Sequence, residues 1–282
     1  MRLDLMRRRA IVPARINIIG EHTDYSGGLS LPFAANYQLT LEANKRISGY
    51  SGDDTVIELW KAAGGWPADI IVNSSIPIGK GLSSSAALCV AVVLCSQGNQ
   101  DLLTVAKEAQ RIEHQVLGTP CGLLDQLAIL YAKKGHASLI DFSDFSIKWV
   151  PIPQNWLFKL VDSDIKRNLS STDYRVDNFL LNNHVIGENS RVLESIKSSP
   201  EELGELLNET HSSLISIGVS LPEIDKQIES LRMIDGVLGA RMMGGGFGGM
   251  ILVLVDGSDV LPNSPILCSS KPAILEEISS FN

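Results

Sequence analysis

The densest group of chemically active side chains in this chain lies in one short loop near its start. The stretch INIIGEHTDYSGG spans residues 16–28, and an apolar segment leads directly into its polar run. That run consists of Glu21, His22, Thr23, Asp24 and Tyr25. A plain surface turn needs glycine, asparagine or serine, but not two acids, an imidazole and a phenol. We therefore interpret this loop as a functional site.

A second segment has the composition of a phosphate-binding loop. In PIGKGLSSSAA, residues 77–87, two glycines allow the backbone to curl and three serines open an apolar stretch of helical character. A helix N-terminus with free N–H groups binds anions, and a serine hydroxyl there can ligate the Mg²⁺ of a nucleotide. The candidate phosphate-binding residues are Gly79, Gly81, Leu82, Ser83, Ser84 and Ser85.

Two other interpretations of this segment compete with a phosphate site. A Walker P-loop requires glycine at position 74 and serine or threonine after Lys80, whereas the chain has Ser74 and Gly81. That motif is excluded. A glycine turn followed by a serine N-cap explains one serine but not three. Taken alone, the segment leaves the turn and the phosphate site equally open.

Two acids border apolar helical stripes further along the chain. Glu113 lies near the end of one expected helix, and Asp125 lies within CGLLDQLAIL. Each has an ordinary interpretation: Asp125 as a first-turn acid that favours the helix dipole, Glu113 as a half-exposed acid that reaches water. Buried acids are rare unless they are paired or bind metal. Two in consecutive helices beside a phosphate loop point to metal-assisted phosphoryl transfer.

The segment GGGFGG, residues 244–249, fits the pattern G-x-G-x-x-G. A dinucleotide-binding fold requires the order strand, glycines, helix. We expect the reverse here, with a helix before the glycines and a strand at 250–255 after them. A close approach of backbone to another loop or to phosphates, or a hairpin-like turn, explains the glycines better.

The elements that must position these residues follow from hydrophobic periodicity and end signals. Strands are expected at 10–19, 37–45, 56–60, 68–75, 136–142, 157–162 and 250–255. Helices are expected at 83–98, at 101–118 between an Asp101 N-cap and a Gly118 stop, at about 121–133, and in polar stretches from 173 to 230. The pattern predicts an α+β protein of two lobes, residues 1–155 and 156–282.

Composition narrows the class of function. The 282 residues carry a formal charge of −8, which disfavours nucleic-acid and acidic-membrane partners. The four cysteines have neither metal-ligand nor disulfide-scaffold spacing, so we expect reduced, mostly buried thiols. No segment reaches the ~18 apolar residues of a membrane span. We expect a cytoplasmic protein, monomeric or weakly oligomeric.

Four segments together carry a family resemblance. RINIIGEHTDYSGG, PIGKGLSSSAA, EHQVLGTPCGLLDQ and GARMMGGGFGG resemble, in this order, motifs of the galactokinases within the GHMP small-molecule kinase superfamily. The resemblance covers residues 13–255. It implies a GHMP kinase fold, with an N-terminal lobe like ribosomal protein S5 domain 2 and a ferredoxin-like C-terminal lobe. It implies ATP-dependent phosphorylation of galactose at its C1 hydroxyl.

The resemblance also implies roles for individual residues. Galactose would be bound by Glu21, His22, Asp24, Gly122 and Tyr174. Ser85 and Glu113 would hold Mg²⁺, and Arg15 and Asp125 would flank the reacting hydroxyl. Carboxylates that accept from adjacent hydroxyls read their stereochemistry, which suits the acids of the first loop. The alternatives are a GHMP kinase for another sugar, such as N-acetylgalactosamine, and a galactose- and ATP-binding sensor. Lys80, Met243 and Met250 depart from residues common in the family.

Overall fold

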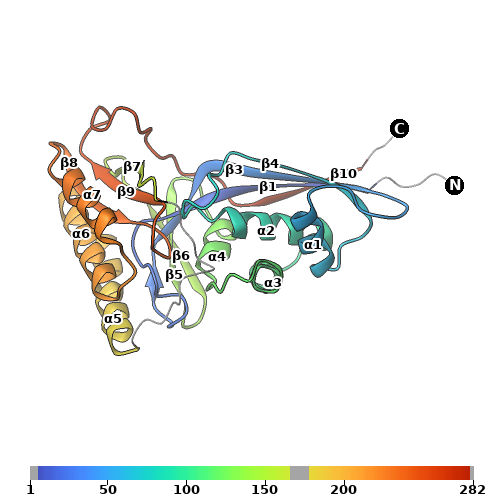
Figure 1. Cartoon of the computed structure of the whole chain (residues 1–282), viewed down its shortest axis with the longest axis horizontal. Coiled ribbons are helices and arrows are strands. Elements are labelled where there is room, and N and C mark those ends of the chain that lie inside the picture. The colour runs from blue at the N-terminus through green and yellow to red at the C-terminus, as the bar shows by residue number, and fades with distance from the viewer. Residues whose placement is uncertain (1–5, 166–177, 280–282) are drawn as a thin grey trace.

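A computed structural model describes residues 6–165 and 178–279. The chain forms an elongated α+β molecule with two lobes, and both described chain ends lie at the far end of the N-terminal lobe (Figure 1). We call the part that contains β1–β6, β10 and the first four helices the N-terminal lobe. The C-terminal lobe contains β7–β9 and the last three helices.

A four-stranded antiparallel sheet forms the backbone of the N-terminal lobe. Its order is β10-β1-β3-β4, with bounds Met6–Asn17 for β1, Pro32–Lys45 for β3, Ala68–Ser74 for β4 and Ile274–Ser279 for β10. Alternate residues of β1, namely Ala10, Val12, Ala14 and Ile16, are fully buried. The helices of this lobe cover one face of the sheet (Figure 1). The strands predicted at 10–19, 37–45 and 68–75 are confirmed.

The helices beneath this sheet carry the candidate acids and serines. They are α1 (Asp54–Ala62), α2 (Ser84–Gln97), α3 (Leu102–Ile112) and α4 (Leu124–Leu130), with a π-helical turn, η1 (Glu113–Leu117), directly after α3. Asp101 caps α3 by accepting from Thr104 N, as predicted. The helix predicted at 121–133 corresponds to the shorter α4. The helix predicted at 101–118 corresponds to α3, which ends at Ile112 and is followed by the π turn.

The strand predicted at 56–60 is wrong, because this segment belongs to α1. Asp53 accepts hydrogen bonds from the N–H groups of Thr55 and Val56 and so starts the helix. Val56, Leu59 and Trp60 then face the core at helical spacing. Five apolar-rich residues do not distinguish a strand from a buried helix by themselves.

A small sheet, β2-β5-β6, belongs to the N-terminal lobe and contacts the C-terminal lobe through β2. Its bounds are Leu29–Ser30 for β2, His136–Asp141 for β5 and Ser146–Pro151 for β6. β5 confirms the strand predicted at 136–142. Because β2 directly follows the polar loop of residues 20–28, its pairing with β5 holds one end of that loop.

The C-terminal lobe is a three-stranded antiparallel sheet backed by three helices. The sheet order is β7-β9-β8, with bounds Leu157–Asp162, Met250–Val255 and Val237–Met242. The helices are α5 (Asn178–Ser195), α6 (Pro200–Ser216) and α7 (Pro222–Arg232). β9 is apolar throughout because both its faces are buried: Leu252 and Leu254 join the core shared with the N-terminal lobe, and Ile251 and Val253 join the core under the helices.

The helix expected before GGGFGG is wrong, because that segment is β8. α7 ends at Arg232, and β8 pairs with β9 across the glycines. The glycine segment is therefore the loop of a β-hairpin. Phe247 N donates to Val219 O, and Met250 N donates to Lys80 O at 3.0 Å. The predicted close approach of this backbone to another loop is confirmed.

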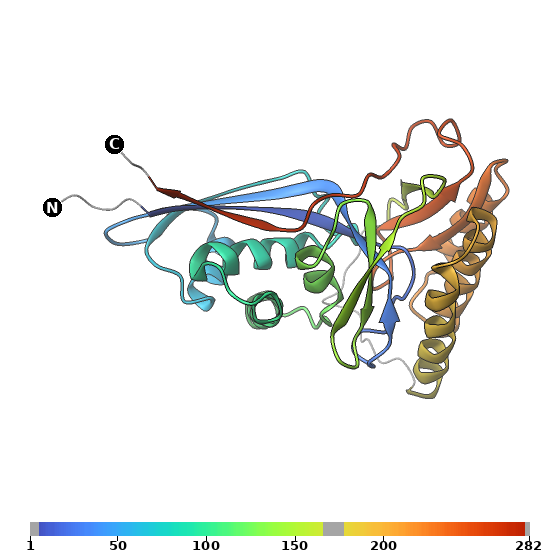
Figure 2. The same cartoon turned by 180° about the vertical axis from the view of Figure 1, so that it is seen from behind.

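The last strand returns to the first sheet. β10 pairs antiparallel with β1 at the end of the molecule opposite the C-terminal lobe (Figure 2). Residues 274–279 therefore lie outside the C-terminal lobe, in which the predicted boundary at residue 155 placed them. Over the described ranges no single helix is long and apolar enough to cross a membrane; α2 and the following helical segment pass that test only as a pair bent by 116°.

Candidate active site

Arg15 and Asp125 form an ion pair where the sheet meets the serine-rich segment. Arg15 Nη2 lies 2.7 Å from Asp125 Oδ1, and Arg15 Nε donates to the same oxygen at 2.8 Å. Nη1 donates to the carbonyl oxygen of Gly81 at 2.6 Å. Arg15 is 4% exposed, and Asp125 lies in the first turn of α4 with part of its side chain open to solvent. One buried guanidinium thus fixes the acid against residues 77–85, called the serine loop below.

The serine loop is a helix start with unpaired polar groups. Gly79, Gly81 and Ser83 have φ values of 71°, 79° and 62°, which turn the backbone into α2. The side chain of Ser83 does not cap the helix, and its buried Oγ has no hydrogen-bond partner within the described chain. Ser84 and Ser85 are the first two residues of α2. An open N-terminus with a free buried hydroxyl suits an anion.

Glu113 lies in the π turn and faces the start of α2. Gln126 Nε2 donates to Glu113 Oε2 at 2.9 Å, and the Ser85 hydroxyl bonds to the same carboxyl group. Burial raises the pKa of Glu113 to about 7, with Asp125 contributing in the same direction, although these hydrogen bonds oppose the shift. A nearby cation would favour the ionised form. The chemistry of a hydroxyl beside a carboxylate therefore fits Mg²⁺.

The described residues hold no group of three or more histidine, cysteine or acidic side chains placed to bind a metal ion. A cation at Ser85 and Glu113 would thus take its remaining ligands from phosphate oxygens and water. Mg²⁺ is usually bound in this way, through one or two carboxylates together with substrate phosphates.

The polar loop of residues 20–28, called the acidic loop below, brings Asp24 against the start of α4. Leu124 N donates to Asp24 Oδ2 at 3.3 Å. Gly122 is required here, because a Cβ atom would lie 1.8 Å from Asp24 Oδ2. Burial, and then the charge of Asp125, raises the pKa of Asp24 to about 6. His22 has φ 59°, and its Nδ1 lies 3.1 Å from the Tyr25 hydroxyl.

Glu21 of the acidic loop is bound by the C-terminal lobe. Its Oε1 accepts from Gly244 N at 2.7 Å and from Arg241 Nη1 and Nη2 at 3.2 Å. Burial alone would raise the pKa of this carboxyl. The charges of Arg241 and Arg15 and the Gly244 hydrogen bond outweigh burial and lower the pKa to about 2. Glu21 therefore stays ionised although only 2% of it is exposed.

Arg241, fully buried on β8, also donates to the carbonyl oxygens of Asn17 and Ile18. The sequence analysis did not select Arg241, although a basic residue in an otherwise apolar segment was a usable signal. His184 and Glu188 of α5 were missed as well. His184 Nε2 lies 2.9 Å from Glu21 O, and Glu188 Oε1 accepts from Gly20 N at 2.8 Å. The C-terminal lobe thus fixes the acidic loop.

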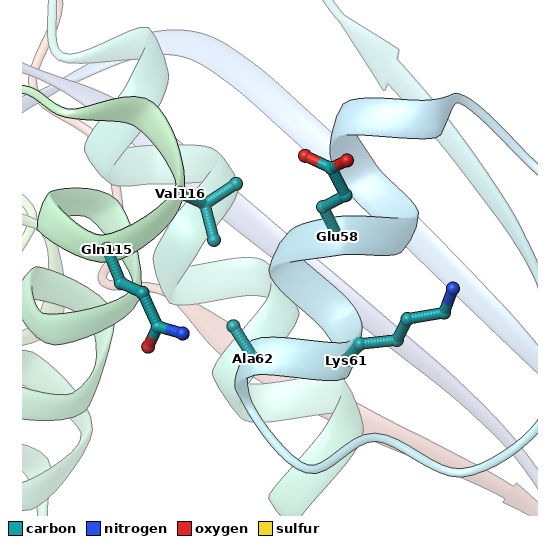
Figure 3. A pocket seen from close by; sticks show the side chains of 5 residues that line it. All are labelled: Glu58, Lys61, Ala62, Gln115 and Val116. Carbon is teal, nitrogen blue, oxygen red and sulfur yellow. The ribbon is translucent and has the colours of Figure 1, made fainter.

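A surface pocket lies beside the candidate active site, and neither Glu113 nor Asp125 lines it. Figure 3 shows the side chains that line it: Glu58, Lys61 and Ala62 come from α1, and Gln115 and Val116 come from η1. The pocket shares the π turn with Glu113. Trp60 of α1 does not line it: this side chain is fully buried and donates through Nε1 to Trp66 O.

The chain is similar to curated galactokinases along most of its length. It is 35% identical to that of Thermotoga maritima, over 86% of this chain and 87% of the relative. It is 32% identical to that of Thermosipho africanus, over 86% and 87%, and 30% identical to that of Glaesserella parasuis, over 90% and 86%. The chain belongs to the galactokinase family. Family models agree: GHMP kinases N terminal domain (39–133), Galactokinase galactose-binding signature (8–45) and GHMP kinases C terminal (192–261).

Solved structures confirm the GHMP kinase fold expected for a galactokinase. The Lactococcus lactis galactokinase complexed with galactose superposes with a TM-score of 0.81 at 23% identity and covers 95% of each chain. The Methanococcus jannaschii mevalonate kinase gives 0.71 at 17% identity and covers 93% of this chain and 98% of its own. At these identities the likeness concerns the fold alone.

The predicted site residues of this galactokinase gather around two loops. Arg15, Gly81 and Asp125 meet at one point, and Ser85 contacts Glu113. Asp24 meets Gly122 beside α4, whereas Glu21 contacts the C-terminal lobe. Tyr174 lies outside the described residues. The roles of all these site residues in substrate binding and catalysis remain predictions.

Proposed function

We propose that this galactokinase transfers the γ-phosphoryl group of ATP to the C1 hydroxyl of galactose, giving α-D-galactose 1-phosphate and ADP. The observation that carries the proposal is the Arg15–Asp125 pair. It joins an acid that adjoins the acidic loop to a guanidinium bound to the serine loop. The sugar and the phosphate donor would therefore meet at one carboxylate.

The acidic loop is suited to reading hydroxyl stereochemistry. Glu21 is held ionised, and Asp24 lies against the Gly122 backbone, so carboxylate acceptors are placed in advance. We assign galactose binding to Glu21, His22, Asp24 and Gly122, with Tyr174 as a further predicted contact. A site that bonds specific hydroxyls leaves its own buried groups unpaired with the wrong sugar, which makes selection steep.

The transfer requires little covalent chemistry from the protein. The C1 oxygen forms a bond to the γ-phosphorus, the bond from that phosphorus to the ADP oxygen breaks, and the hydroxyl proton passes to Asp125. Arg15 orients this carboxylate and offsets charge on the phosphoryl group. Most of the rate enhancement then comes from positioning and charge stabilisation.

Mg²⁺ fits the Ser85 hydroxyl and the Glu113 carboxylate, and when bound it would neutralise charge on the ATP phosphates. The serine loop, from Gly79 through Ser85, would hold the phosphates with backbone N–H groups and with the Ser83 hydroxyl, which no described residue pairs.

The test is ADP release by the purified chain with Mg–ATP and a panel of galactose, its C4 epimer glucose, N-acetylgalactosamine and mevalonate. We expect release with galactose, a far lower rate with glucose, and a product whose phosphate NMR spectrum is that of a C1 phosphate. Release with another panel member alone would overturn the substrate. Calorimetric galactose binding without turnover on any panel member would overturn the enzyme.

A further inference from the structure

The serine loop contains one cation, Lys80, which lies between Gly79 and Gly81. It is the sole basic residue between Lys61 and Lys107. In a chain of net charge −8, an anionic nucleotide depends on such local positive charge.

The backbone of Lys80 is fixed, whereas its side chain lies at the surface. The carbonyl oxygen of Lys80 accepts a hydrogen bond from Met250 N. Gly249 lies so close that a Cβ atom added to it would be 2.8 Å from the same oxygen. The Lys80 side chain is 21% exposed and reaches Asp162, the last residue of β7, with Nζ 2.6 Å from Oδ1. The ammonium group can therefore leave Asp162 without moving the loop.

Asp162 is a weak competitor for this ammonium group. Its side chain is 37% exposed, and its Oδ1 also accepts from Asp164 N at 2.9 Å. Ion pairs at the solvent boundary contribute little net free energy. A nucleotide phosphate carries more charge than one carboxylate and forms charge-assisted hydrogen bonds.

We propose that Lys80 is a nucleotide-phosphate ligand, which Asp162 holds in the nucleotide-free chain and releases when the nucleotide binds. The proposal rests on the proposed function, because it takes the serine loop to be the phosphate site. It assigns Asp162 the opposite effect: this acid lowers nucleotide affinity by competing for Lys80.

The test is calorimetric binding of MgADP to two single variants. Lys80→Met should raise the Kd by about tenfold, the value of a hydrogen bond to a charged group. Asp162→Asn should lower the Kd by about two- to fivefold, because it removes the competing charge. A matched control is Asp69→Asn, which breaks the exposed Arg46–Asp69 pair at the other end of the sheet and should leave the Kd unchanged.

The double variant Lys80→Met/Asp162→Asn separates competition from simple repulsion. If Asp162 acts through Lys80, its substitution has no effect in the Lys80→Met background. Weaker MgADP binding in both single variants would show that the Lys80–Asp162 pair supports nucleotide binding by holding the two lobes together, and it would overturn the proposal. An unchanged Kd in Lys80→Met would overturn it too. Either outcome leaves galactose turnover by the unsubstituted chain, and so the proposed function, intact.

Discussion

The acidic loop and the serine loop lie on either side of the Arg15–Asp125 pair, but they differ in whether their buried polar groups have partners within the described protein. In the acidic loop, Glu21 is paired with Arg241 and Gly244 from the other lobe, before any ligand is bound. In the serine loop, the buried Ser83 hydroxyl has no partner within the described residues.

The difference between the two loops fits the ligands that we propose for them. Hydroxyl stereochemistry is read only by acceptors in fixed positions, and the buried Glu21–Arg241 pair gives the acidic loop, our proposed sugar site, such a position. A phosphate is recognised by charge and by free N–H and O–H donors, and in the proposed phosphate loop the Ser83 hydroxyl has no partner among the described residues. Rigidity on one side and unpaired donors on the other suit a sugar acceptor and a nucleotide donor.

The largest effect is expected at the junction of the two loops. Asp125→Asn keeps an oxygen beside Arg15 but removes the proton acceptor, so kcat should fall by about 10²- to 10⁴-fold. KM for galactose and for ATP should change little. Steady-state kinetics check this, with Asp144→Asn, an exposed acid between β5 and β6, as the control. Unchanged kcat in Asp125→Asn would remove this residue from catalysis.

The second prediction concerns stability and separates the loops. Arg241→Met leaves Glu21 as a buried carboxylate without its ion-pair partner, so the free energy of unfolding should fall by about 3–5 kcal/mol. Urea denaturation measures the change. Lys80→Met, which breaks the surface pair of the serine loop, should lose at most about 1 kcal/mol.

A rescue makes this prediction specific. Glu21→Gln in the Arg241→Met background removes the unpaired charge and should recover part of the lost stability. Equal losses of unfolding free energy in Arg241→Met and Lys80→Met, or no recovery in the double variant, would contradict the claim that buried charge stabilises the acidic loop more than the serine loop.

The third prediction uses the pKa of Asp24, which burial raises to about 6. As a hydroxyl acceptor Asp24 must be ionised, so galactose affinity should increase between pH 5 and pH 7.5, and Asp24→Asn should bind weakly at every pH. The raised pKa means that ionisation destabilises the fold. Asp24→Asn should therefore be more stable than the unsubstituted chain above pH 6, on the order of 1–2 kcal/mol, and no more stable at pH 3.5.

Calorimetry of galactose binding and urea denaturation across this pH range provide both readouts. A flat pH profile of affinity in the unsubstituted chain would show that Asp24 does not accept a sugar hydroxyl. A stability gain that is the same at pH 3.5 and pH 7.5 would assign the effect of the substitution to packing rather than to charge.

Local signals in the sequence predicted much of the fold. Alternating apolar residues indicated β1, the Asp101 cap indicated the start of α3, and the apolar run at 250–255 indicated β9. The serine loop and both helical acids were found as well, because glycine spacing and acids on apolar helices are unusual even in isolation. These features depend on neighbours within a few residues.

The missed features depend on distant partners. Arg241 binds Glu21 from 220 residues further along the chain, and nothing near Arg241 reveals that carboxylate. β8 was predicted as a helix because its strand character comes from pairing with β9. Likewise, Glu113 begins a π turn and contacts Ser85 of another helix, and no residue pattern at 113–117 predicts either feature.

The smallest expected effect concerns the Ser83 hydroxyl of the serine loop. Ser83→Ala removes a buried hydroxyl that has no hydrogen-bond partner among the described residues, so the chain should become more stable by about 1 kcal/mol while its KM for ATP rises a few fold. Ser96→Ala, at the other end of α2, is the matched control, because its hydroxyl donates to Val92 O and its loss should destabilise the chain slightly. Opposite signs of the two stability changes, measured by urea denaturation, would show that the serine loop keeps an unpaired donor at a cost in stability. A loss of stability in Ser83→Ala would show that this hydroxyl is already satisfied, and the two loops would then differ less than the structure indicates.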